Sequence, residues 1–219
     1  MFLLAAVPGA LAVLALVGVR EQPQLPMRRR PESRGRGRVP AGLLVAIGIF
    51  TVGNSTDALL LLRAETLGVP TIQLPLLWAT LHVVRALLSW PMGRIADRLG
   101  RERALITGWL WYAACYAGFA AARAPVHVWL LFAAYGLVAA LTEGTERALV
   151  AAAVPEDTRG RALGIYNLVT GTGLVAASVL AGQIWEHTSP AAALLFGALS
   201  AFLASALLAL RPSGRAAAV

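Results

Sequence analysis

Apolar residues dominate the chain in long runs, and polar residues gather in the short breaks between them. A helix needs roughly 20 mostly apolar residues to cross a bilayer, and seven runs approach that length. The pattern predicts an all-α membrane protein with seven transmembrane helices, at Phe2–Val19, Ala41–Leu62, Ile72–Met92, Ala104–Ala122, Val126–Ala153, Arg161–Trp185 and Ala191–Leu210.

Composition supports a membrane location. The 219 residues are 58% hydrophobic and 14% charged, with a mean hydropathy of +0.69. One soluble core cannot hide so much apolar surface. The short N-terminal run is a poor signal peptide, because no basic residue precedes it and arginines follow it. We expect a span inserted with its N-terminus outside, and a chain that begins so abruptly resembles a cut product.

The basic residues predict how the spans are oriented. All 19 are arginines, and 15 of them lie in alternate connections and in the C-terminal tail, against two, Arg63 and Arg123, on the other side. The positive-inside rule places the rich side in the cytoplasm. The N-terminus is then outside and the C-terminus cytoplasmic. The Pro, Ser and Gly content of residues 20–40 favours a cytoplasmic linker near anionic lipid over a nucleic-acid patch, so no nucleic-acid partner is expected.

Catalytic and metal-binding chemistry find little support in the residue pattern. Cys115 is the one cysteine, and three histidines, His82, His127 and His187, fall in or beside different spans without a metal-binding spacing. The chain has no lysine, which excludes a retinal Schiff base. We expect no cofactor, no metal and no enzymatic activity.

The stretch GRIADRLGRER concentrates charge at the predicted cytoplasmic turn between the third and fourth runs. Its charges recur at i, i+3 and i+4, Gly93 allows close approach of a neighbouring helix, and Gly100 supplies the permissive backbone of a helix C-cap. Asp97 is then placed to accept hydrogen bonds from the N-terminus of another helix. These features favour an ordered latch over a simple topological signal.

This stretch resembles the signature loop of the major facilitator superfamily, G-x-x-x-D-R-x-G-R-[KR]-[KR]. Glu102 departs from the pattern, and the matching residues are Gly93, Asp97, Arg98, Gly100, Arg101 and Arg103. Residues 155–167 resemble the P-E-x-x-R-G-x-A-x-G segment of the same superfamily. Residues 53–64 and the triplet Thr142-Glu143-Gly144 resemble an uncharacterised bacterial branch of it.

The resemblance implies a transporter of twelve helices in two halves. Residues 1–19 would be its sixth helix, 20–40 the central loop, 41–210 the six-helix C-terminal half with two inverted three-helix repeats, and 211–219 a cytoplasmic tail. It implies a bacterial inner-membrane protein that exports a small molecule, coupled to protons, by alternating access. Its partners would be the substrate, the lipid bilayer, and either a missing N-terminal half or a second copy of this chain.

Polar and charged residues within the spans are candidate site residues, because charge is costly there. Asn54, Asp57 and Glu143 are candidates for substrate binding or proton coupling, and Asp57 could instead be a packing device. Arg85, Glu146 and Arg147 are expected to form an ion-pair network with Asp97 that gates the cytoplasmic side. A Glu143–Arg147 pair at i, i+4 is an alternative.

Small residues in the sixth run predict close helix packing. Gly164, Gly171, Ser178 and Gly182 are spaced to form one stripe that a neighbouring helix can approach. Two functional alternatives stay open at this point. One is a seven-helix receptor, and the other is a half-transporter that pairs with itself.

Overall fold

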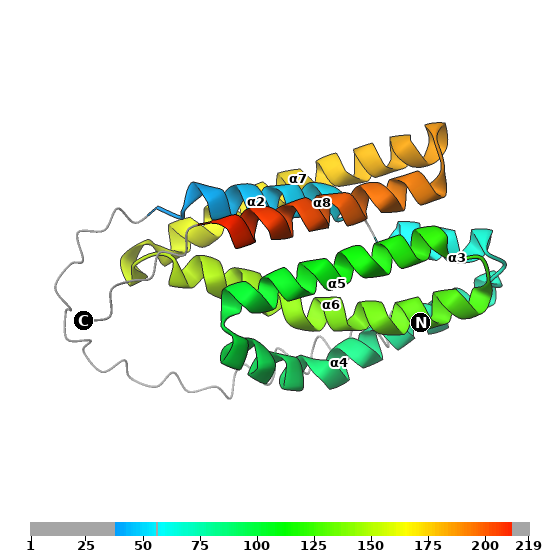
Figure 1. The fold of residues 1–219 in the computed structure, drawn as a ribbon, viewed down its shortest axis with the longest axis horizontal. Helices are drawn as coiled ribbons and strands as arrows, with labels where there is room; N and C mark the ends of the chain where they lie inside the picture. Colours follow the sequence, from blue (N-terminus) through cyan, green and yellow to red (C-terminus); the bar gives the residue numbers. More distant parts are fainter. Residues whose placement is uncertain (1–37, 56, 212–219) are drawn as a thin grey trace, which may run out of the picture. The chain divides into compact units, whose positions relative to one another are not determined.

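The computed structural model describes residues 38–55 and 57–211, and the described part is built from helices without strands. Its elements, labelled as in Figure 1, are α2 (Ala41–Gly53), α3 (Ala58–Thr66), η1 (Thr71–Gln73), α4 (Leu74–Leu99), α5 (Arg101–Ala121), α6 (Pro125–Ala152), η2 (Glu156–Thr158), α7 (Arg159–His187) and α8 (Pro190–Leu210).

Within residues 38–55 and 57–211, six helical segments are long and apolar enough to cross a membrane. Two of them combine elements: α2 and α3 form one segment, Ala41–Thr66, and η1 with α4 forms another, Thr71–Leu99. They correspond to the second through seventh predicted runs, so those six predictions are confirmed. The first predicted helix, Phe2–Val19, most of the linker 20–40 and nearly all of the tail 211–219 lie outside the described residues.

Local sequence explains where several helices begin and end. Proline stands in the first turn of α4, α6 and α8, where its missing N–H costs nothing. Ser189 caps α8, because its hydroxyl accepts a hydrogen bond from the Ala192 N–H at 3.1 Å. Gly100, with φ 86°, is both the C-cap of α4 and the N-cap of α5.

The α4–α5 connection corrects one prediction. The predicted C-cap at Gly100 is confirmed, but we expected the turn to occupy Gly93 to Arg103, whereas α4 continues as far as Leu99 and α5 begins at Arg101. The charged stretch is therefore almost entirely helical, and the turn is a single glycine. Polar and apolar residues at i, i+3 and i+4 extend a helix beyond the apolar run, which explains the difference.

The core of the described helices centres on α5. It packs against α6 on one side and α8 on the other, and α2 packs against α7 and α8. Figure 1 shows these helices side by side. Aromatic rings fill the centre, with Phe50 stacked on Trp109 at 4.9 Å between ring centroids and Tyr112 stacked on Tyr116 at 4.0 Å.

Glycines allow the closest helix approaches, although not the ones predicted. A Cβ on Gly197 of α8 would lie 2.8 Å from the Gly53 carbonyl oxygen, and one on Gly173 of α7 would lie 2.9 Å from Thr51. By contrast, Gly164, Gly171 and Gly182 have no atom of the described chain within 4 Å of such a Cβ. The predicted packing stripe is wrong for these helices, because the opposite face of α7, with Gly173, packs against α2.

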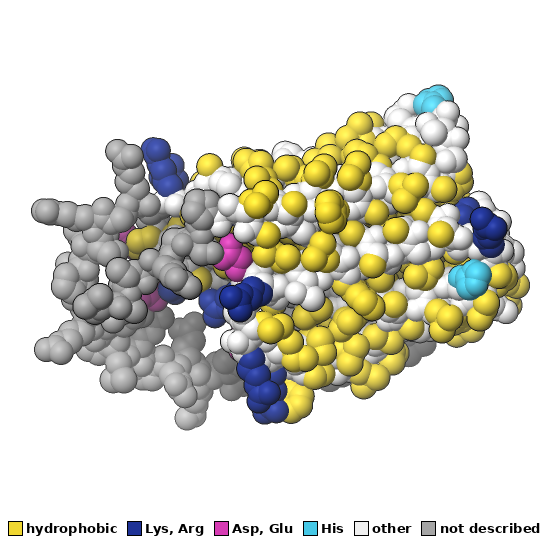
Figure 2. Space-filling model, in the orientation of Figure 1, with side chains coloured by type: hydrophobic (Ala, Val, Ile, Leu, Met, Phe, Trp, Pro, Cys, Tyr) yellow, Lys and Arg dark blue, Asp and Glu magenta, His cyan; other side chains and the backbone are white. Residues whose placement is uncertain are grey.

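The outer surface of the described helices carries a wide apolar band. Figure 2 shows hydrophobic side chains covering the middle of the visible face, with arginines at one end and an arginine and histidines at the other. Large exposed side chains such as Leu87, Trp90 and Leu199 contribute to the apolar surface of the unit. An apolar band between charged ends is what a bilayer requires.

Candidate functional site

A cavity of about 880 Å³ lies among α2, α4, α5, α6, α7 and the segment between α2 and α3. Aromatic and aliphatic side chains share its wall with polar ones. Its charged, amide and imidazole side chains, which are rare in apolar helices, are Asn54, Asp57, His82, Arg85, Glu146 and Arg147. Five of the predicted site residues therefore share one cavity.

The helix that carries Asn54 and Asp57 is broken. α2 ends at Gly53 and α3 begins at Ala58, so Asn54 and Asp57 do not lie on one continuous helix, as a single uninterrupted span would have placed them. Both side chains line the cavity, Asn54 directly after α2 and Asp57 directly before α3.

Two tyrosines from neighbouring helices bind the two sides of the break. The Tyr135 hydroxyl of α6 donates to Asp57 Oδ1 at 2.8 Å, and the Tyr112 hydroxyl of α5 donates to the Gly53 carbonyl oxygen at 3.2 Å. In a continuous helix that carbonyl would accept the N–H four residues later. Here the Ser55 N–H, at 3.0 Å, and the Tyr112 hydroxyl take the place of that donor, so the carbonyl stays paired, as the interior of a membrane requires.

Glu146 of α6 is a buried carboxylate that accepts hydrogen bonds from two neighbouring helices. Its side chain is 7% exposed, and it accepts hydrogen bonds from Trp109 Nε1 at 3.1 Å and from the Tyr166 hydroxyl at 3.0 Å. The two donors come from α5 and α7. Glu146 therefore joins three helices at the wall of the cavity.

Arg85 of α4 and Arg147 of α6 line the same cavity as Glu146. Three members of the predicted ion-pair network therefore share one cavity. Arg85 also lines a second, smaller cavity. Glu143 belongs to α6, and its side chain lies outside the described set. The ion-pair network stays a prediction.

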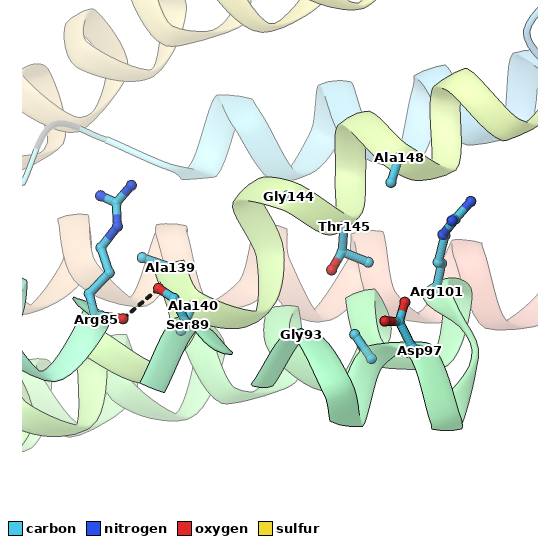
Figure 3. Close-up of a pocket in the computed structure, with 11 residues that line it drawn as sticks. Arg85, Ser89, Gly93, Asp97, Arg101, Ala139, Ala140, Gly144, Thr145 and Ala148 are labelled. Atoms are coloured by element: carbon cyan, nitrogen blue, oxygen red, sulfur yellow. Dashed lines mark hydrogen bonds between the residues drawn. The ribbon is translucent and has the colours of Figure 1, made fainter. Parts of the chain in front are cut away.

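A second cavity, of about 350 Å³, lies between the C-terminal parts of α4 and α6, next to the start of α5 (Figure 3). Arg85 and Ser89 line one end, Asp97 and Arg101 the other, and Gly144 lies on α6 above them. Asp97 is exposed and forms no hydrogen bond or ion pair with the described residues. The latch built on Asp97 therefore stays a prediction, as do the roles of Gly93, Arg98 and Arg103, which are exposed beside it.

Sequence reasoning missed the aromatic hydrogen-bond donors. Tyr112, Tyr116 and Tyr135 lie close together, with ring centroids 4.0 to 6.0 Å apart, and the Tyr116 hydroxyl is buried without a partner among the described residues. The hydroxyl groups of these tyrosines are the feature of the sequence that could have revealed them as donors. Three phenols in otherwise apolar spans need hydrogen-bond partners, and the acids of other spans are the natural ones.

Comparison with known proteins connects this geometry to a family. The sequence profile of the Major Facilitator Superfamily matches residues 40–218. The "Uncharacterized MFS-type transporter MJ1317" of Methanocaldococcus jannaschii is 32% identical over 94% of this chain and 54% of its own length. The "Multidrug resistance protein MdtH" of Klebsiella pneumoniae is 28% identical over 80% of this chain and 45% of its own.

A third relative is similar over a shorter part. The "Uncharacterized MFS-type transporter YhjO" of Bacillus subtilis is 29% identical over 53% of this chain and 29% of its own length. The chain thus spans at most about half the length of these curated relatives. Six membrane-crossing helices and the profile match over most of the sequence agree, and the chain is an integral membrane protein that belongs to the major facilitator superfamily.

Proposed function

We propose that the protein transports a small molecule across the membrane, as the C-terminal half of a secondary active transporter that works by alternating access. The cavity of about 880 Å³ carries this proposal, because it gathers Asp57, Glu146 and two arginines among apolar helices. Ionisable groups inside a membrane are costly and mark substrate or ion pathways.

Asp57 is the residue that we propose for proton coupling or cation recognition. It is half-buried, lines the cavity, and accepts a hydrogen bond from a neutral phenol. A carboxylate that lines a cavity in this way can take up a proton or bind a cationic ligand. Asn54 lines the same cavity and can donate to a substrate. Glu143 stays in the proposal from its sequence position alone.

Export is the proposed direction. The similarity to a protein named for multidrug resistance supports it, and a cavity whose wall combines aromatic, aliphatic and charged side chains suits amphiphilic molecules. The smaller cavity supports a cytoplasmic gate in which Arg85 and Asp97 take part, because both residues line it. The gate would close when the two halves of the transporter rock against each other.

A second half is part of the proposal. In α4 and α7 only 11% and 17% of the most apolar stretch is buried, against 39–47% in the other four segments. Helices so poorly covered by their own chain suit contact with another bundle. The proposed occupant is an N-terminal half, as the length of the relatives suggests, and pairing with a second copy of this chain is the alternative.

Transport can be tested in everted membrane vesicles that contain the full-length protein, with ethidium as the probe and a proton gradient as the energy source. We expect uncoupler-sensitive ethidium accumulation, abolished by Asp57→Asn. Asp157→Asn is the matched control, because Asp157 is exposed in η2. Accumulation that Asp57→Asn leaves unchanged removes Asp57 from the mechanism, and wild-type vesicles that match empty ones refute export of this probe class.

A further inference from the structure

The wall of the cavity of about 880 Å³ offers a ligand many hydrogen-bond acceptors but few donors. Seven hydroxyl groups of this wall already donate to acceptors of the protein itself, and they belong to Thr51, Tyr112, Tyr135, Thr142, Tyr166, Thr170 and Ser178. A hydroxyl group has one proton to donate and two lone pairs that accept. These seven groups can therefore accept from a ligand without breaking an internal bond, but they cannot donate to it.

His82 adds a further acceptor in its neutral form. Its Nδ1 lies 3.0 Å from the Trp78 carbonyl oxygen. A carbonyl can only accept, so Nδ1 carries the proton and Nε2 is left as an acceptor. The strongest donors of the wall are therefore the guanidinium groups of Arg85 and Arg147, because they are charged.

The two arginines have different surroundings. Arg85 is half-buried and lines both cavities, whereas Arg147 is exposed and lines the cavity of about 880 Å³. Arg147 forms no ion pair with any carboxylate whose side chain the structure describes. Its neighbour in the sequence, Glu146, accepts from Trp109 and Tyr166. The positive charge of Arg147 is thus accessible from the cavity.

Arg63 shows by contrast a guanidinium that the protein uses for its own structure. It donates to three carbonyl oxygens at the end of α5, at 3.1 to 3.3 Å. Arg147 lies beside the Tyr166 hydroxyl, which has already given its proton to Glu146. A guanidinium has five N–H donors, and one phenol oxygen can accept at most two of them. Arg147 therefore keeps donors for a ligand.

The accessible acid and the accessible base of the cavity are well separated. Asp57 is bound to Tyr135 of α6, and Arg147 follows Tyr135 by twelve residues on the same helix, about 18 Å along its axis. Asp57 is therefore too distant to neutralise Arg147 as an ion pair. The same wall carries the aromatic rings of Phe50 and Trp78. It combines an apolar surface with a separate positive charge.

We propose that Arg147 binds an anionic group, such as a carboxylate, of an amphiphilic substrate in this cavity, and that it thereby distinguishes acids from their esters. The inference rests on the proposed transport function, since it names the class of substrate that the same cavity takes. A guanidinium binds a carboxylate through two parallel charge-assisted hydrogen bonds. An ester has no charge and offers weaker acceptors.

Tetramethylrhodamine and its methyl ester test the proposal, because the two dyes share one cationic ring system and differ in a free carboxylate. Fluorescence anisotropy measures their binding to the full-length protein in nanodiscs, with the signal of empty nanodiscs subtracted. Arg147→Gln should weaken binding of the acid about tenfold or more. It should leave binding of the ester equal or slightly stronger, because a repelling cation is gone.

Two further variants serve as controls. Arg147→Lys keeps the charge but loses the two-pronged geometry, so its preference for the acid should lie between those of wild type and Arg147→Gln. Arg161→Gln should bind both dyes like the wild type, since Arg161 is exposed at the start of α7 and lines neither cavity. Retained ester binding shows that Arg147→Gln is folded. If that variant binds neither dye, the acid-to-ester ratio of Arg147→Lys decides.

An acid-to-ester ratio that Arg147→Gln leaves unchanged overturns the inference, and an ion pair of Arg147 with Glu143 would give that result. A larger change of the ratio in Arg85→Gln also overturns it, as does wild-type protein that binds the acid no better than empty nanodiscs. The binding assay is independent of transport. Failed ethidium transport with intact selectivity for the acid contradicts only the proposed function, whereas normal transport without that selectivity contradicts only this inference.

Discussion

Two carboxylates in one cavity differ in how completely the protein satisfies them. Glu146 is buried and receives hydrogen bonds from two side chains on different helices, whereas Asp57 is half-buried and receives one from Tyr135. A carboxylate that joins three helices contributes to stability, and its removal leaves buried donors unpaired. A less enclosed carboxylate can exchange partners. We assign Glu146 a structural role on this ground and keep Asp57 for transport.

Glu146→Gln should lower the free energy of unfolding by about 1–3 kcal/mol. The amide keeps one acceptor oxygen, but its nitrogen cannot accept, so either Trp109 or Tyr166 loses its hydrogen-bond acceptor. Thermal unfolding of the purified protein in detergent measures the change. Glu186→Gln is the control, since Glu186 is exposed near the end of α7. Equal stability of the two variants would contradict the structural role.

Gly197→Ala should destabilise the protein by about 1–3 kcal/mol through overpacking. The new methyl group would lie 2.8 Å from both the Gly53 carbonyl oxygen and the ring of Tyr116. Gly164→Ala, with no described atom within 4 Å, should be neutral or slightly stabilising. The same unfolding assay compares them, and a destabilised Gly164→Ala would reveal a neighbour beyond the described residues.

At the scale of elements, the α4–α5 junction separates two glycines of the signature stretch. Gly100 has φ 86° and ψ 138°, a conformation that is essentially restricted to glycine. Gly93 lies within α4, where a side chain meets no described atom within 4 Å. One glycine is required by the backbone of this chain, and the other is not.

Gly100→Ala should therefore cost about 1–3 kcal/mol of stability, while Gly93→Ala should be neutral or stabilising. Circular dichroism during heating in detergent gives both values. If Gly93→Ala keeps its stability but loses transport, a second bundle contacts α4 at this point. If Gly100→Ala unfolds like the wild type, the one-residue turn can relax.

The elements that could be predicted are those that depend only on neighbouring residues in the sequence. Each of six apolar runs carries its own length and composition, so six spans were found. The break after Gly53 could not be found in this way, because Asn54 and Ser55 are tolerated in a continuous helix. Its stabilising donors, Tyr112 and Tyr135, lie 59 and 78 residues from the groups that they bind. Similarly, Glu146 and Trp109 are separated by 37 residues.

For the whole molecule, the orientation in the membrane rests on the arginines and can be measured. A fluorescent protein fused after Gly100 should fluoresce, because that turn is predicted to face the cytoplasm. Alkaline phosphatase fused after Arg123 should be active, because that turn is predicted to face the opposite side. The reversed pair of signals would overturn the orientation, and with it the assignment of the smaller cavity to the cytoplasmic half.

The proposed second half predicts the size of the native protein. The intact mass of the gene product, isolated from source membranes with an antibody against residues 20–40, should be about twice the 23.0 kDa of this chain. A product of 23.0 kDa would instead favour pairing of two copies. Cross-linking in the same membranes would then be expected to yield a homodimer.

Arg63 has a consequence for how charge directs insertion. It is one of two arginines on the side of the membrane that the charge rule leaves poor, and its guanidinium binds three carbonyl oxygens at the end of α5. Because α5 follows Arg63 in the chain, these acceptors become available only after α5 has formed. Arg63 then keeps its charge but is held at one fixed place, so the end of α5 decides where this cation rests in the folded protein.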